Sequence, residues 1–162
     1  MDHVEYYFDS DEKKVKSIIL DNIQHAIEKQ AELDGFYPED YASTLSFVCF
    51  NKKTNEVLTF SLGDSRIYRI RDDEVEHINQ TVAHDHNRVC STVSFGAQRE
   101  AVLESFIMTE GDRFLLCTDG MWKMAEAEGL LVLLCSSCDG GVLVDRLMQC
   151  KIKDDCSFLL AA

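Results

Sequence analysis

The sequence contains very little proline and no long hydrophobic run. One proline and eight glycines among 162 residues argue against a linker-rich or fibrous chain. No apolar stretch reaches the roughly 20 residues that a transmembrane helix needs. The first residues, Met1 to Glu5, are acidic and polar, which is not typical of a signal peptide. We therefore expect a cytoplasmic protein with no membrane partner.

Positive charge is also scarce. The chain has 16 Lys and Arg against 29 Asp and Glu, which gives a net charge of −13. Because nucleic acids and anionic membranes attract basic surfaces, this balance predicts no nucleic-acid partner. It suits a protein that collects cations, although acidic cytosolic proteins are common. Seven cysteines, an odd number without a secretory signal, indicate reduced thiols.

The remaining composition and the apolar periodicity predict one globular domain over residues 1–162. Apolar residues make up 46% of the chain and charged residues 28%, which is typical of a protein with a sizeable core. The pattern predicts a helix over 10–33, strands over 42–50, 56–62, 66–70 and 75–78, a turn over 93–97, strands over 101–108 and 114–118, helices within 121–138 and 142–150, and a last strand over 156–161. The short turns between the first four strands predict an antiparallel meander.

The stretch from Gly111 to Trp122 is the most informative part of the chain. A Gly-Asp turn leads into an apolar run of buried-strand length, which stops at Thr118-Asp119-Gly120. An Asp at the end of a buried strand is held rigidly, and a neighbouring Gly allows close approach of backbone or ligand. Such a carboxylate is a natural ligand for Mg²⁺ or Mn²⁺. An ordinary strand-ending turn fits the same residues, and core packing is expected for Trp122.

Two further segments also combine an apolar strand with an acidic corner. Asp64 follows the run Phe60 to Gly63, and Asp154 stands just before the terminal apolar strand. If these strands lie close together, Asp64, Asp119 and Asp154 converge. Clustered carboxylates repel one another unless a cation lies between them. The three residues are therefore candidate metal ligands.

Five segments, in order along the chain, resemble motifs of the type-2C metal-dependent Ser/Thr protein phosphatases (PPM-type). They are Ser43-Thr44, the Gly-Asp-Ser-Arg start at 63–66, Asp85-His86, the stretch 111–122, and Asp154 to Ser157. One such match is weak, whereas five in the right order at workable spacing are specific. The resemblance runs from about residue 12 to the C-terminus.

The resemblance implies an α+β fold, an antiparallel β-sandwich flanked by helices in α/β/β/α layers and incomplete at the N-terminus. It implies Asp119 and Asp154 as ligands of one metal of a binuclear Mg²⁺ or Mn²⁺ centre. It implies Asp64, together with Asp119, as a ligand of a third, weaker metal found in bacterial members. The implied activity is hydrolysis of phosphoesters in phosphoprotein substrates by metal-activated water. No catalytic residue beyond the metal ligands is assigned, and the substrate-binding residues stay open.

The sequence departs from the family in two respects. Nothing before Ser10 corresponds to the family's N-terminal third, with its phosphate-binding Arg, Glu-Asp pair and Asp-Gly-X-Gly-Gly segment, whose Asp bridges both catalytic metals. The flap between Asp85-His86 and Asp119 is short, which puts substrate selection by a flap in doubt. We therefore expect weak metal binding and slow or absent turnover. Missing strands would leave sheet edges unpaired, which favours a homodimer.

Other functions and other residues have their own interpretations. A pseudophosphatase that acts as a binding or regulatory module fits the same motifs. A cation-binding structural protein is a third interpretation, which requires the motif matches to have arisen by chance. Pairing with a carboxylate is expected for Arg66 rather than phosphate binding. A hydrogen-bonded turn is favoured over a metal clamp for His84 and His86. Cys135 and Cys138 are expected to be ordinary thiols rather than a redox or zinc motif.

Overall fold

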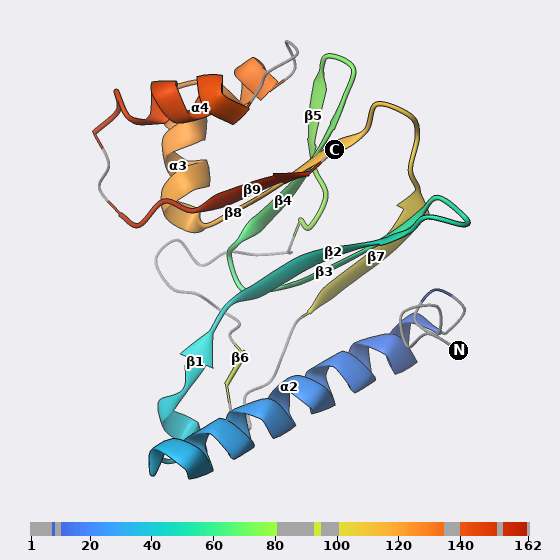
Figure 1. The fold of residues 1–162 in the computed structure, drawn as a ribbon, viewed down its shortest axis with the longest axis vertical. Coiled ribbons are helices and arrows are strands. Elements are labelled where there is room, and N and C mark those ends of the chain that lie inside the picture. Colours follow the sequence, from blue (N-terminus) through green and yellow to red (C-terminus); the bar gives the residue numbers. More distant parts are fainter. Residues whose placement is uncertain are drawn as a thin grey trace. The chain divides into compact units, whose positions relative to one another are not determined.

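The computed structural model describes residues 8, 11–80, 93–94, 101–134, 140–151 and 154–161. The chain divides into two compact units, the first formed by Met1–Asp64 and Thr81–Met108 and the second by Ser65–Gln80 and Thr109–Ala162. Each unit combines an antiparallel sheet with helices (Figure 1). The predicted α+β class is confirmed, and the single domain over 1–162 stays a prediction.

The first unit is built on a three-stranded sheet. Its strands β2 (Leu45–Asn51), β3 (Glu56–Leu62) and β7 (Val102–Ile107) lie in the order β2-β3-β7. The β2–β3 hairpin closes at a turn in which Asn55 adopts φ 58°, a left-handed conformation that Asn tolerates well. A second small sheet pairs β1 (Ala42–Ser43) with β6 (Val93–Ser94).

Helix α2 (Glu12–Asp34) packs on the β2-β3-β7 sheet. It begins at Asp11, whose side chain accepts hydrogen bonds from the backbone N–H groups of Lys13 and Lys14. It ends at Gly35, which adopts φ 72°, the left-handed conformation that favours glycine at a helix end. The short 3₁₀ helix η1 (Pro38–Asp40) follows. The core between helix and sheet contains these buried apolar residues: Val15, Ile19, Leu58, Phe60, Leu62, Ala101 and Leu103.

The second unit is built on a four-stranded sheet in the order β5-β4-β8-β9. The strands are β4 (Arg66–Arg71), β5 (Glu74–His77), β8 (Arg113–Cys117) and β9 (Phe158–Ala161). The helices are α3 (Asp119–Ala127), the 3₁₀ helix η2 (Leu130–Leu134) and α4 (Gly140–Leu147). Sheet and helices share one core, formed by the buried residues Tyr68, Ile70, Leu115, Cys117, Met121, Ala125, Leu130, Leu143 and Leu147.

The predicted four-strand meander is wrong. Strands β2 and β3 pair with each other, and β4 pairs with β5 and β8, so the consecutive strands β3 and β4 belong to different sheets. The chain changes sheet at Gly63, which adopts φ 114° and packs so tightly on Thr44 that a Cβ would clash with that side chain. Thr44 also divides the expected strand 42–50 into β1 and β2. The expected turn at 93–97 begins instead with β6, because Val93 and Ser94 pair with β1.

The described helices include none that could cross a membrane. Although α2 spans 23 residues, neither it nor any other described helix has the apolar stretch that a bilayer crossing requires. Asp85, His84 and His86, and likewise Cys135 and Cys138, lie outside the described part of the chain.

Candidate metal centre

Asp119 lies where the buried strand β8 turns into helix α3. The polar Thr118 ends the strand with an extended backbone (φ −73°, ψ 167°), and Asp119 is the first helical residue. A carboxylate in the first turn is stabilised by the N–H groups and the positive end of the helix dipole. The Gly120 N–H donates to Asp119 Oδ1 at 2.9 Å, and Lys123 Nζ donates to Oδ2 at 2.8 Å.

The Asp154 segment is joined directly to the end of β8. The Thr118 N–H donates to the Ser157 carbonyl oxygen at 3.0 Å, and the Ser157 N–H donates to Thr118 Oγ1 at 3.0 Å. The same Thr118 hydroxyl donates to the Asp155 carbonyl oxygen at 3.2 Å. Because one threonine connects both segments, Asp119 and Asp154 belong to a single corner of the second unit.

Gly120 allows these two segments to approach closely. A Cβ atom added at Gly120 would lie 2.5 Å from the Asp155 carbonyl oxygen and 3.1 Å from Asp154 Cβ. Because the nearest atom belongs to the backbone and cannot shift as a flexible side chain can, this position favours glycine. This is the close approach that the Asp-Gly pair in the sequence predicts. The structure thus brings two of the three predicted ligands together.

Negative charge is concentrated at the corner. Burial raises the pKa of the Cys156 thiol, and the negative charges of Asp154, Asp155 and Asp119 raise it further. Hydrogen bonding from Lys123 lowers the pKa of Asp119 below its ordinary value. Asp119 therefore presents ionised oxygen atoms at neutral pH, and the concentration of negative charge favours a cation.

Asp64 is the last residue of the first of the two segments that form the first unit, and it directly follows Gly63 after the end of β3. The backbone after it is held by Asn79, whose Nδ2 donates to the Ser65 carbonyl oxygen at 2.8 Å and whose Oδ1 accepts from the Ile67 N–H at 2.6 Å. Since Asp119 and Asp154 belong to the other unit, the convergence of Asp64 with them stays a prediction. Within the described ranges, no three His, Cys, Asp or Glu side chains form a group that could hold a metal.

Arg66 and Trp122 form a second feature beside the corner. The guanidinium carbon of Arg66 lies 3.4 Å from the centre of the Trp122 ring, which is a cation–π contact. Arg66 also pairs with Glu126 of α3 and donates to the Tyr68 hydroxyl at 2.9 Å. The predicted pairing of Arg66 with a carboxylate is confirmed. Trp122 packs against the core of the second unit, as expected.

Sequence reasoning missed three residues of this region. Thr118 is recognisable only once its partners in the 154–157 segment are known, and the same holds for Asn79, which contacts the backbone at the start of β4. Lys123 stands four residues after Asp119, the spacing at which opposite charges meet on a helix. The predicted helix begins only at residue 121 and so leaves Asp119 outside it, whereas α3 includes both residues.

The family assignment rests on a match to most of the sequence. The profile of the protein phosphatase 2C family matches residues 2–139. The chain therefore belongs to the protein phosphatase 2C family. The comparison with curated proteins gives no match.

Solved structures show the same fold. PppA, a key regulatory component of T6SS in Pseudomonas aeruginosa, is 24% identical with a TM-score of 0.70, and the match covers 93% of this chain and 70% of that one. Stp1 of Staphylococcus aureus is 19% identical with a TM-score of 0.69, over 94% of this chain and 69% of that one. The catalytic domain of PstP in complex with two manganese ions is 20% identical with a TM-score of 0.65, over 85% of this chain and 64% of that one. At these identities the likeness concerns the fold.

Proposed function

We propose that the chain is a protein Ser/Thr phosphatase-type domain in which Asp119, Asp154 and Asp64 bind Mg²⁺ or Mn²⁺ weakly. The observation that carries the proposal is the corner in which Thr118 and Gly120 place the Asp119 and Asp154 segments against each other. Membership of the phosphatase 2C family and the manganese ions of the PstP catalytic domain support the choice of metal.

The residues of the corner fit a hard cation in part. Ionised carboxylate oxygens are the donors that Mg²⁺ and Mn²⁺ prefer, and Gly120 leaves no side chain between the two segments. Two carboxylates supply a minority of the six ligands of an octahedral ion, so water would complete the shell. A bound ion would supply a water of lowered pKa for attack on phosphorus. The role of Asp119 and Asp154 would be to hold and orient the ion.

Slow turnover on a phosphoprotein substrate is the expected behaviour. The described residues offer no group of three metal-binding side chains, and the sequence has no Asp-Gly-X-Gly-Gly segment. The same two observations favour the second candidate function, a pseudophosphatase that binds a phosphoprotein partner without hydrolysing it. For both candidate functions we propose that the protein acts in the cytoplasm.

Calorimetric titration with Mn²⁺, together with a p-nitrophenyl phosphate assay, tests the proposal. We expect weak binding heat that disappears in Asp119→Asn and Asp154→Asn. Asp145→Asn removes one negative charge from an exposed position of α4 and should retain the heat. Turnover should stay below about 1 s⁻¹, the low end of ordinary enzyme rates. Binding that survives both aspartate substitutions would refute the metal site, whereas fast metal-dependent turnover would refute only the expectation of weak activity.

A further inference from the structure

We propose that Lys123 is an internal counter-ion that competes with the divalent cation for Asp119, and so sets the metal concentration at which the site fills. The inference rests on the proposed role of Asp119 and Asp154 as metal ligands. Lys123 would oppose metal binding, and it lies on α3, the same helix as the candidate ligand Asp119.

The Lys123 ammonium lies against an oxygen of the candidate ligand Asp119. Lys123 Nζ lies 2.8 Å from Asp119 Oδ2, and the Gly120 N–H occupies Oδ1 at 2.9 Å. Both oxygens of this carboxylate therefore already accept a hydrogen bond. A cation that binds Asp119 therefore displaces the ammonium from Oδ2 or uses a remaining lone pair of the carboxylate with the positive charge of Lys123 close by.

Trp122 helps to hold the ammonium in place. Lys123 Nζ lies 5.4 Å from the centre of the Trp122 ring, within the range in which the electron-rich face of an indole attracts a cation. The ring is itself fixed by the Arg66 guanidinium at 3.4 Å, and Arg66 is anchored by Glu126. Lys123 is thus attracted by a carboxylate and a ring together, although its side chain is 57% exposed.

Asp154 lacks a comparable counter-ion in the described part of the chain. Its Oδ1 accepts only the Asp155 N–H, at 2.8 Å, and no described ion pair includes it. Lys123 therefore neutralises one carboxylate of the corner and leaves the other available. Among the described residues, an incoming dication meets one carboxylate with a lysine counter-ion and one without, which makes binding weaker than two carboxylates without a counter-ion would allow.

The test is Mn²⁺ titration of the full chain by calorimetry, at fixed pH and ionic strength. Removing the charge in Lys123→Gln should lower the Kd for Mn²⁺ by about 3- to 20-fold, the range expected for losing one partly screened positive charge beside a dication. Lys123→Arg keeps the charge and should stay within about twofold of wild type. Arg146→Gln changes the net charge equally but on α4 and should also stay within about twofold.

Two further measurements separate the possible failures. The melting temperature of metal-free Lys123→Gln should fall by no more than about 2 °C, because an exposed pair with i,i+4 spacing contributes little to stability. If Asp154→Asn abolishes Mn²⁺ binding but Lys123→Gln binds like wild type, the counter-ion role is wrong and the metal site stands. If wild type and Lys123→Gln show no Mn²⁺ binding, or show binding that Asp154→Asn does not remove, the metal site itself is wrong. The counter-ion role of Lys123 is then wrong as well.

Discussion

Asp112 carries a buried carboxylate that three hydrogen bonds satisfy. Arg71 donates from Nε to Oδ1 at 2.6 Å and from a second guanidinium nitrogen to Oδ2 at 2.7 Å, and the Thr109 N–H donates to Oδ2 at 2.9 Å. The Asp112 side chain is 0% exposed, whereas that of Arg71 is 37% exposed. The forked guanidinium matches the carboxylate geometry, so this acidic residue fastens β4 to the turn before β8.

This pair predicts a specific pH dependence of stability. Hydrogen bonding from Arg71 holds the pKa of Asp112 below its ordinary value of 3.8. Because the folded-state pKa is the lower one, the stabilisation is complete above pH ~4 and is lost as the pH falls through the folded-state pKa. Asp112→Asn should lower the free energy of unfolding at pH 7 by about 2–3 kcal/mol, since a buried partner of the guanidinium is lost. Urea unfolding at pH 7, at pH 4 and at pH 2 measures both effects.

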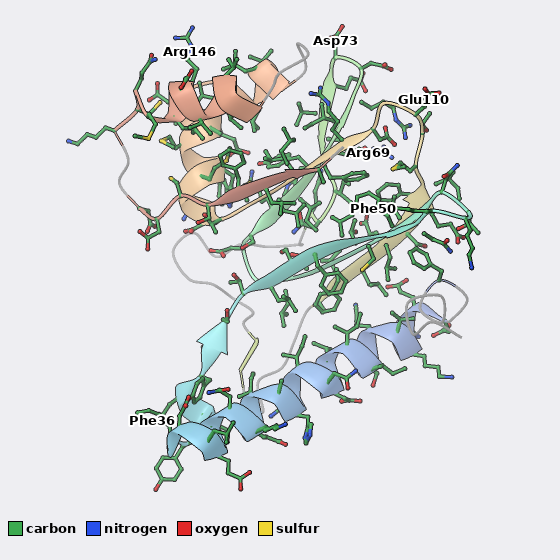
Figure 2. All side chains as sticks on the ribbon, in the orientation of Figure 1. Phe36, Phe50, Arg69, Asp73, Glu110 and Arg146 are labelled. Carbon is green, nitrogen blue, oxygen red and sulfur yellow. The ribbon has the colours of Figure 1, made fainter. Side chains whose placement is uncertain are left out.

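A matched control lies in the β4–β5 turn, where Asp73 is exposed at the surface (Figure 2). Asp73→Asn should change the free energy of unfolding by less than about 0.5 kcal/mol. If Asp112→Asn kept the wild-type decrease in stability between pH 4 and pH 2, the acid sensitivity would have to come from other carboxylates.

Local sequence is sufficient to predict some residues of the candidate site and insufficient for others. Asp119 and Gly120 could be predicted because they directly follow an apolar strand. Both the end of a strand and the preference for glycine can be inferred from neighbouring residues. Asn79 could not, because its partners at Ser65 and Ile67 are brought near only when β4 and β5 pair. The same is true of Thr118.

At the scale of elements, the helix and strand positions were predictable, but the pairing of strands was not. The helix expected over 10–33 corresponds to α2, and the strand expected over 56–62 has the same bounds as β3. Alternating apolar residues indicate that a segment is extended, but they do not say which strand lies beside it. That is why β3 and β4, joined by a three-residue connection, were wrongly placed in one sheet.

The beginning of α2 offers a test at this scale. Asp11 Oδ1 accepts the N–H groups of Lys13 at 3.0 Å and Lys14 at 3.4 Å, which would otherwise lack partners in the helix. Asp11→Ala should lower the free energy of unfolding by about 1 kcal/mol, and Asp11→Ser should restore most of the loss, because serine also caps helices. Thermal unfolding followed by circular dichroism measures both variants.

Glu32→Ala, an exposed position near the other end of α2, is the control and should change the free energy of unfolding by less than about 0.5 kcal/mol. Equal losses in Asp11→Ala and Asp11→Ser would show that the side-chain oxygen has no capping role.

For the molecule as a whole, the edge of the first unit's sheet predicts self-association. Among the described strands, β2 pairs only with β3, and a strand at the edge of a sheet can accept a further strand. We propose a homodimer formed through this edge, with a mass twice the 18.4 kDa of the chain. Because the net charge is −13, raising the ionic strength should strengthen the dimer by screening repulsion. Sedimentation equilibrium at several protein and salt concentrations measures this.

A lysine placed in the middle of the edge should oppose pairing, so Val48→Lys is expected to shift the equilibrium to monomer. Val144→Lys, the same substitution at an exposed position of α4, is the control and should leave the dimer intact. A wild-type chain that sediments as a monomer at every concentration would exclude the dimer.

The division of the chain between the two units has a consequence for its biosynthesis. Strands alternate between the units, with β2 and β3 in the first, β4 and β5 in the second, β7 again in the first, and β8 and β9 in the second. The β2-β3-β7 sheet cannot be completed until β7 has left the ribosome, and β4 must wait still longer for β8. The nascent hairpins therefore emerge with open edges and uncovered apolar faces, the state in which chains depend on chaperones. Neither unit is a contiguous segment, so neither can be expressed alone as a single excised piece of the gene.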